Sequence, residues 1–93
     1  MNRIEDRDIL AKTAELLDLP MDVVAGLPSM ELLGNRQLFL SRHQGIMSYS
    51  DTAIDINCGK LLVRVRGTGL LLLSMTSDEL RIGGVIEGVE LSR

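Results

Sequence analysis

The chain has 93 residues, enough for one domain, and its 45% of hydrophobic residues can form a real core. The formal net charge of −3 and the two aromatic residues, Phe39 and Tyr49, argue against a nucleic-acid binder, which needs a basic excess or a platform for base stacking. One cysteine, Cys58, cannot form an intrachain disulfide, which favours a reducing compartment. The start has no apolar signal core, and no aliphatic run is long enough to cross a bilayer. We therefore expect a soluble, cytoplasmic protein without a transmembrane segment.

Residues 1–28 are predicted to form a helical leader. Leu10, Ala14 and Leu17 recur at the spacing of one helix face, and acidic residues precede them, where the helix dipole favours negative charge. Pro20 bars further continuation of the helix. We therefore expect one N-terminal α-helix, followed by a short helical turn and a link to the rest of the chain.

Residues 29–93 are predicted to form a β-domain. Apolar doublets, in which two apolar residues flank one other residue, recur about every eight or nine positions, as in strands joined by short connections. They are Leu38/Leu40, Ile54/Ile56, Val63/Val65, Leu71/Leu73, Leu80/Ile82 and Val89/Leu91. The expected fold class is mainly β, a small antiparallel β-sandwich-like domain built from consecutive hairpins. A short β-solenoid is the alternative, because every second doublet lies seventeen or eighteen residues from the last, which suits one rung.

Three turns define the expected register. They are Cys58-Gly59, Gly67-Thr68-Gly69 and the loop 76–79. The pairs that they predict are Ile56/Leu61, Ile54/Val63, Val65/Leu71, Val63/Leu73, Met75/Leu80 and Leu73/Ile82. These hairpins agree on one buried face, which a wrong register would not do, and a bulge is expected near Gly88. We therefore expect Leu73→Ala to cost about 2–5 kcal/mol of stability and Leu72→Ala much less.

The opposite face of the predicted sheet carries a candidate interaction surface. Its members are Leu62, Arg64, Arg66, Leu70 and Leu72. An apolar strip on the second face of a sheet needs a cover, such as a helix of the same chain, a second sheet or another subunit. Arginine beside aliphatic side chains is typical of docking patches. The plainer interpretation is a solvated face on which Arg64 lies near Asp55.

Few residues of the chain could carry chemistry. His43 is the single histidine and Cys58 the single thiol, so one chain cannot assemble a usual zinc site, and no glycine-flanked nucleophile motif is present. The glycines lack the lysine and the following helix of a phosphate loop. We therefore expect no enzyme activity, no catalytic residue, no cofactor and no metal. The imidazole of His43 is expected to bond to backbone in a turn.

The order of several motifs along the chain resembles that of a known family. The motif His43-x-Gly45-Ile46-x-x-Tyr49 follows Pro28-Ser29-Met30-Glu31-Leu32-Leu33-Gly34-Asn35 and precedes Gly67-x-Gly69-Leu70 and Glu79-Leu80-x-Ile82-x-Gly84. This order resembles the YabP/YqfC family of bacterial sporulation proteins, with its YqfC branch as the closest, over nearly the whole chain. The loop with His43, Gly45 and Tyr49 is the most specific part. The family commonly has asparagine before the histidine and a basic residue after it, where this chain has Arg42 and Gln44.

The resemblance implies a non-enzymatic protein of endospore-forming bacteria that acts in the mother cell. It implies a structural or adaptor role in the mother-cell cytoplasm, peripheral to the forespore membrane. Docking would be to a membrane-associated partner, such as a YqfD-like membrane protein, or to itself as a homo-oligomer. The alternative is a small ligand- or anion-binding module that uses the His43 loop, Arg64 and Arg66. Neither function involves nucleic acid.

Overall fold

The computed structural model describes residues 26–93, which form six β-strands. The strands are β1 (Ser29–Leu33), β2 (Gln37–Ser41), β3 (Ile46–Tyr49), β4 (Ala53–Cys58), β5 (Leu61–Met75) and β6 (Glu79–Ser92). They form one sheet in the order β1-β2-β6-β5-β4-β3, and every neighbouring pair is antiparallel. The mainly β, antiparallel fold class is confirmed, and the β-solenoid is wrong because its rungs would pair in parallel. The expected N-terminal helix lies outside the described residues.

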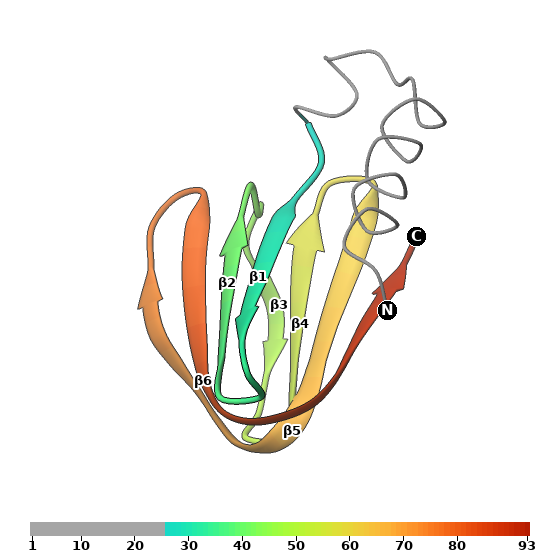
Figure 1. Ribbon diagram of the computed structural model, residues 1–93. Helices are drawn as coiled ribbons and strands as arrows, with labels where there is room; N and C mark the ends of the chain where they lie inside the picture. The colour runs from blue at the N-terminus through green and yellow to red at the C-terminus, as the bar shows by residue number, and fades with distance from the viewer. Residues whose placement is uncertain (1–25) are drawn as a thin grey trace, which may run out of the picture.

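Strands β5 and β6 are long enough to run through two layers. They contain 15 and 14 residues, and both bend at the bottom of the view in Figure 1, so that the sheet folds over on itself. The first layer contains β1, β2, the start of β6 and the end of β5. The second layer contains β3, β4, the start of β5 and the end of β6. The sandwich-like form therefore comes from one folded sheet.

Glycines at the bend allow the two long strands to approach each other closely. A Cβ atom on Gly67 would overlap the carbonyl oxygen of Val85, and one on Gly84 would lie 2.6 Å from the carbonyl oxygen of Gly69. Gly84 also has a φ of 125°, which other residues rarely adopt. The register between β5 and β6 shifts at three places, one of them beside Gly88, as predicted. Because bulges bend strands and increase their twist, these shifts are the physical cause of the fold-over.

The two layers enclose one hydrophobic core. Strands β2 and β4 show the strict alternation of buried and less buried residues that is typical of strands with one face on a core. The buried apolar residues are Leu38, Leu40, Ile54, Ile56, Cys58, Val63, Val65, Leu70, Leu80, Ile82 and Ile86. Removal of this apolar surface from water on both inner faces is the main favourable term that holds the layers together.

The first predicted hairpin has the correct buried face but the wrong pairs. Ile56 pairs with Val63, whereas the sequence predicted Leu61. The tight turn is formed by Gly59 and Lys60, one residue later than expected, with Gly59 at a φ of 83°. A partner shift of two residues keeps every side chain on the same face, so the predicted burial of this hairpin is confirmed.

The second predicted hairpin is wrong. Residues 67–69 lie inside β5, where Gly69 has a φ of 61° and the register against β6 shifts. This offset reverses the side-chain directions that follow, because side chains alternate along a strand. Leu70 is 3% exposed and Leu71 is 56% exposed, the reverse of the prediction. Leu72 packs partly buried against the core, and Leu73 is exposed instead of buried.

The third predicted turn is confirmed. A short loop joins β5 to β6, and Met75 pairs with Leu80 as expected. Ile82, however, pairs with Leu72, because the last of the three register shifts leaves Leu73 without a directly opposed partner.

Gly67→Ala is expected to destabilise the protein by at least about 2 kcal/mol, because the added methyl group has no room beside the backbone of Val85. Gly34→Ala is the control: nothing lies within 4 Å of its Cβ position, so the change adds backbone strain of about 1 kcal/mol and no crowding. Urea unfolding measures both losses. If Gly67→Ala is no worse than the control, close approach of the strands does not depend on this glycine.

Leu70→Ala is expected to cost about 2–5 kcal/mol, because the side chain is buried in the core. Leu71→Ala is expected to cost less than about 1 kcal/mol, because the neighbouring side chain is exposed. Chemical unfolding of the two variants under the same conditions gives the comparison. Similar losses at both positions would contradict the one-residue offset in β5.

Candidate functional site

The loop that contains His43 crosses from the first layer to the second. The backbone amides of Arg42 and His43 both donate to the carbonyl oxygen of Asp78, in the turn between β5 and β6. On the other side, the amide of Gln44 donates to the carbonyl oxygen of Asn57 at 2.7 Å. Arg42 has a φ of 67°, unusual for a residue other than glycine. The loop therefore joins the β5–β6 turn to the end of β4, and we refer to residues 42–45 as the His43 clasp.

The imidazole of His43 is fully used inside this clasp. It is 5% exposed, and its Nδ1 accepts a hydrogen bond from the amide of Gly45 at 3.0 Å. The hydrogen must therefore be on Nε2, which donates to the carbonyl oxygen of Thr76 at 3.0 Å and lies 3.3 Å from that of Glu79. Both nitrogens have partners, so the ring holds backbone together and has no free atom for a ligand. The prediction that this imidazole bonds to backbone is confirmed.

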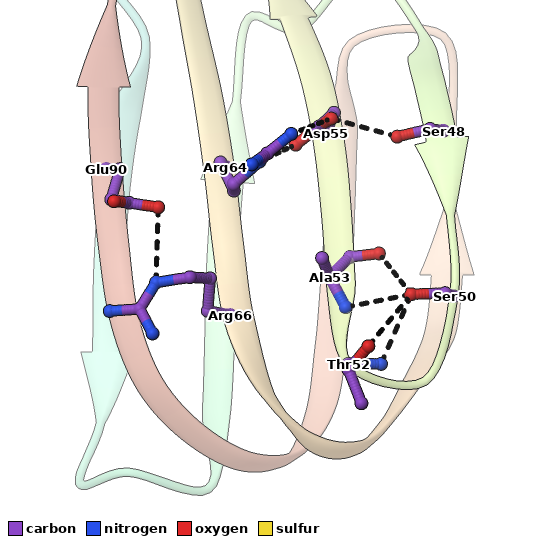
Figure 2. Close-up of polar contacts among 8 residues, drawn as sticks. All are labelled: Ser48, Ser50, Thr52, Ala53, Asp55, Arg64, Arg66 and Glu90. Carbon is purple, nitrogen blue, oxygen red and sulfur yellow. Dashed lines mark hydrogen bonds and ion pairs between the residues drawn. The ribbon is translucent and has the colours of Figure 1, made fainter.

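Tyr49 ends β3 and bonds to β5, so it takes no part in the His43 clasp. Its hydroxyl oxygen accepts a hydrogen bond from the amide of Leu72 at 2.8 Å. The amide of Leu70 donates to the carbonyl oxygen of Asp51 in the β3–β4 turn. Within this turn, the Ser50 hydroxyl oxygen accepts hydrogen bonds from the amides of Thr52 and Ala53 (Figure 2). These bonds cover part of the edge of β5, so this edge is poorly suited to addition of a strand from another molecule.

The outer face of the second layer carries paired charges. Figure 2 shows Asp55 between Arg64 and Ser48, on three neighbouring strands. Arg64 donates from Nε to Oδ1 at 2.7 Å and from Nη2 to Oδ2 at 2.9 Å, and Ser48 also donates to Oδ2 at 2.9 Å. The hydrogen bond from Arg64 lowers the pKa of Asp55, and the same bond raises the pKa of Arg64. The proximity of Arg64 and Asp55 is therefore confirmed, and the guanidinium is already occupied.

The predicted interaction surface is divided by the structure. Arg64 and Arg66 are exposed on the outer face of the second layer with Leu62 half-buried beside them. Arg66 donates to Glu90 at 3.1 Å on β6. The placement of Leu70 and Leu72 on this face is wrong, because both lie beyond the bend and pack in or against the core. The predicted residues therefore do not form one continuous surface.

Other reactive groups of the described chain have little chemical freedom. Cys58 is buried, and burial raises the pKa of its thiol, which disfavours the nucleophilic thiolate. It lines an open hollow of about 420 Å³ together with Gln44, Lys60 and Leu61. Within residues 26–93, no group of three or more His, Cys, Asp or Glu residues is arranged to hold a metal ion. The raised pKa makes the thiol of Cys58 a poor nucleophile.

Three exposed leucines of the sheet share a surface that the sequence did not indicate. The outer side of the first layer, which we call the first-layer face, carries Leu33 on β1, Phe39 on β2, Arg81 on β6, and Leu71 and Leu73 on β5. The three leucines are 52%, 56% and 46% exposed in chain order. The guanidinium of Arg81 lies over the ring of Phe39, 4.4 Å from its centroid. The sequence did not predict this face, because the exposure of Leu71 and Leu73 depends on the register shifts in β5.

Comparisons with known proteins give one distant relationship. The chain is 20% identical over 73 residues to "Uncharacterized protein YqfC" of Bacillus subtilis strain 168, and the match covers 78% of each chain. No family model and no solved structure matches the chain. The similarity supports a YqfC-like relationship, in agreement with the sequence motif. In the part of the chain that the structure describes, no helix is long and apolar enough to span a membrane.

His43→Phe is expected to destabilise the protein by about 2–4 kcal/mol, because the partly buried amide of Gly45 and the carbonyl of Thr76 lose their partners. Gln44→Ala is the control, because that side chain is exposed and the backbone bonds of the clasp stay in place. Chemical unfolding and amide hydrogen exchange at Gly45 measure the effect. Unchanged stability together with unchanged protection of the Gly45 amide would show that the imidazole does not hold the clasp.

Proposed function

We propose that this protein is a non-enzymatic adaptor or structural component of sporulation in an endospore-forming bacterium. It acts in the mother cell, where it docks to a membrane-associated partner or to itself at the forespore surface. The similarity to YqfC and the motif of His43, Gly45 and Tyr49 support the process. The two partners that this proposal names are a YqfD-like membrane protein and a second copy of the chain, with the protein in the cytoplasm and peripheral to the membrane.

The observation that carries the docking role is a contrast between the reactive groups and the surface. Among residues 26–93, nine large hydrophobic side chains are exposed: Leu27, Leu32, Leu33, Met47, Tyr49, Leu71, Leu73, Met75 and Leu91. By contrast, the imidazole of His43 and the carboxylate of Asp55 are bonded within the chain. A small domain that exposes much apolar surface while its reactive groups are occupied is suited to binding macromolecules.

The anion-binding alternative receives less support from the same geometry. It needs free hydrogen-bond donors in the His43 clasp and on Arg64 and Arg66. Arg64 is held by two hydrogen bonds to Asp55, and Arg66 bonds to Glu90. An anion would have to displace these carboxylates, which are close competitors of the same charge. We therefore favour the adaptor function.

A deletion strain is expected to form few heat-resistant spores, and the wild-type gene is expected to restore them. A variant with Leu71→Ser and Leu73→Ser should fold, because both side chains are exposed, but should fail to restore spores or to be recovered with the membrane fraction. Arg66→Ser with Glu90→Ser is the control, because it removes one exposed ion pair on the other layer without changing net charge. Counts of heat-resistant colonies and immunoblots of fractions measure the outcome. Two results together would contradict the proposal: normal sporulation of the deletion strain, and absence of the wild-type protein from the membrane fraction of the parent strain.

A further inference from the structure

Side chains on the first-layer face form rows that run across the strands. Cross-strand pairing gives three rows, in the order β1, β2, β6 and, where present, β5. They are Leu33–Gln37–Gly83–Leu71, Glu31–Phe39–Arg81–Ser74 and Ser29–Ser41–Glu79. In every row β2 is flanked by β1 on one side and by β6 on the other. A two-fold axis that runs along β2 would therefore place β1 of one molecule over β6 of another.

From this arrangement we infer that the first-layer face binds a second copy of the same chain, with the two-fold axis along β2. Glu31 of each copy then faces Arg81 of the other, an acid against a base. Leu33 faces Gly83, which has no side chain. The side chain of Leu73 partly fills that space, so Leu33 of one copy meets Leu73 of the other. Ser29 faces Glu79, a hydroxyl donor against a carboxylate. One operation thus produces three complementary contacts, each of them twice.

The other two-fold axis in the same plane is disfavoured by charge. An axis that runs across the strands through the middle row would place Glu31 against Glu31 and Arg81 against Arg81. Like charges that face each other across an interface cost free energy and exclude the wrong arrangement. The face therefore specifies one relative orientation of the two copies, which a patch with random charges would not do.

Within one chain, Glu31 and Arg81 are separated by Phe39 and do not form a salt bridge. The two salt bridges of the described residues are Arg64–Asp55 and Arg66–Glu90, both on the second layer. The guanidinium of Arg81 instead rests on the ring of Phe39, close to the proposed axis. This position leaves its hydrogen-bond donors available to a carboxylate from above. Arginine and aromatic residues at the centre of a patch are common features of protein interfaces.

The size of the face sets the expected strength. The three strands that overlap, β1, β2 and β6, each contribute about five residues and together cover on the order of 200–300 Å² per copy, which places the dimer among weak, reversible associations. We therefore expect a concentration-dependent equilibrium rather than a permanent dimer. The inference rests on the proposed docking function, since it names the occupant of the docking face, but its test needs only the purified chain.

Sedimentation velocity of the full chain from about 10 µM to about 1 mM should show a monomer–dimer equilibrium for the wild type. Glu31→Arg and Arg81→Glu should each weaken the dimer by about tenfold or more, because each creates two like-charge contacts. An equimolar mixture of the two variants should dimerise again, because Arg at position 31 of one then faces Glu at position 81 of the other. Repair in the mixture cannot come from contacts within one chain. Glu87→Arg, outside the face, carries the same charge change as Glu31→Arg and is its control.

Far-ultraviolet circular dichroism and thermal unfolding of each variant confirm that it is folded, which the exposure of Glu31 and Arg81 leads us to expect. A wild type that stays monomeric over this range overturns the inference while leaving the sporulation experiment unaffected. A dimer that both charge reversals leave intact also overturns it, since association would then use another surface, such as the free edge of β1. Failure of the mixture to dimerise overturns the proposed two-fold axis.

Discussion

The bend in β5 and β6 determines which side chains form the core and which lie on the surface. Because the same two strands pass through both layers, the layers are continuous in the chain, and the place of the bend decides which side chains face each other across the core. The backbones meet closely at Gly67 and Gly84, where a side chain has no room. Once the sheet is folded there, the inner faces of β2 and β4 cover each other, so neither layer needs a second sheet from elsewhere.

Local pattern predicted the strands well and failed at the point where the long-range fold intervenes. The alternation of β4 and of the first half of β5 fixed the buried face, and an error of two residues in the hairpin left that face unchanged. At residues 67–69 the pattern is ambiguous, because two glycines between apolar doublets suit a tight turn and a bulge equally. The choice between them is made by contacts with β6, more than fifteen residues away in sequence. The exposure of Leu71 and Leu73 was therefore beyond a local prediction.

The candidate site was predictable to the extent that it depends on neighbours in the sheet. The Arg64–Asp55 pair follows from two strands joined by a tight turn, and the sequence indicated it as the plainer interpretation. The contact of the His43 ring with Thr76 joins positions 33 residues apart, and no local spacing encodes it. The same holds for Tyr49, whose hydroxyl reaches Leu72 only after the sheet has folded over. The family motif identified His43 and Tyr49 in the sequence. Their hydrogen-bond partners come close only when the two layers have formed.

The two outer faces differ in how their charges are satisfied, and this difference bears on function. On the second layer, the acids and bases are placed on adjacent strands and neutralise each other within the chain, as Arg64 with Asp55 and Arg66 with Glu90 show. A face of this kind gives a partner little to recognise, because its charged hydrogen bonds are already made. On the first layer, Phe39 on β2 lies between Glu31 on β1 and Arg81 on β6. The two charges are therefore kept apart, and both lie on the outer face beside exposed leucines. Apolar area supplies attraction there and the separated charges supply orientation, a combination that the paired face cannot offer.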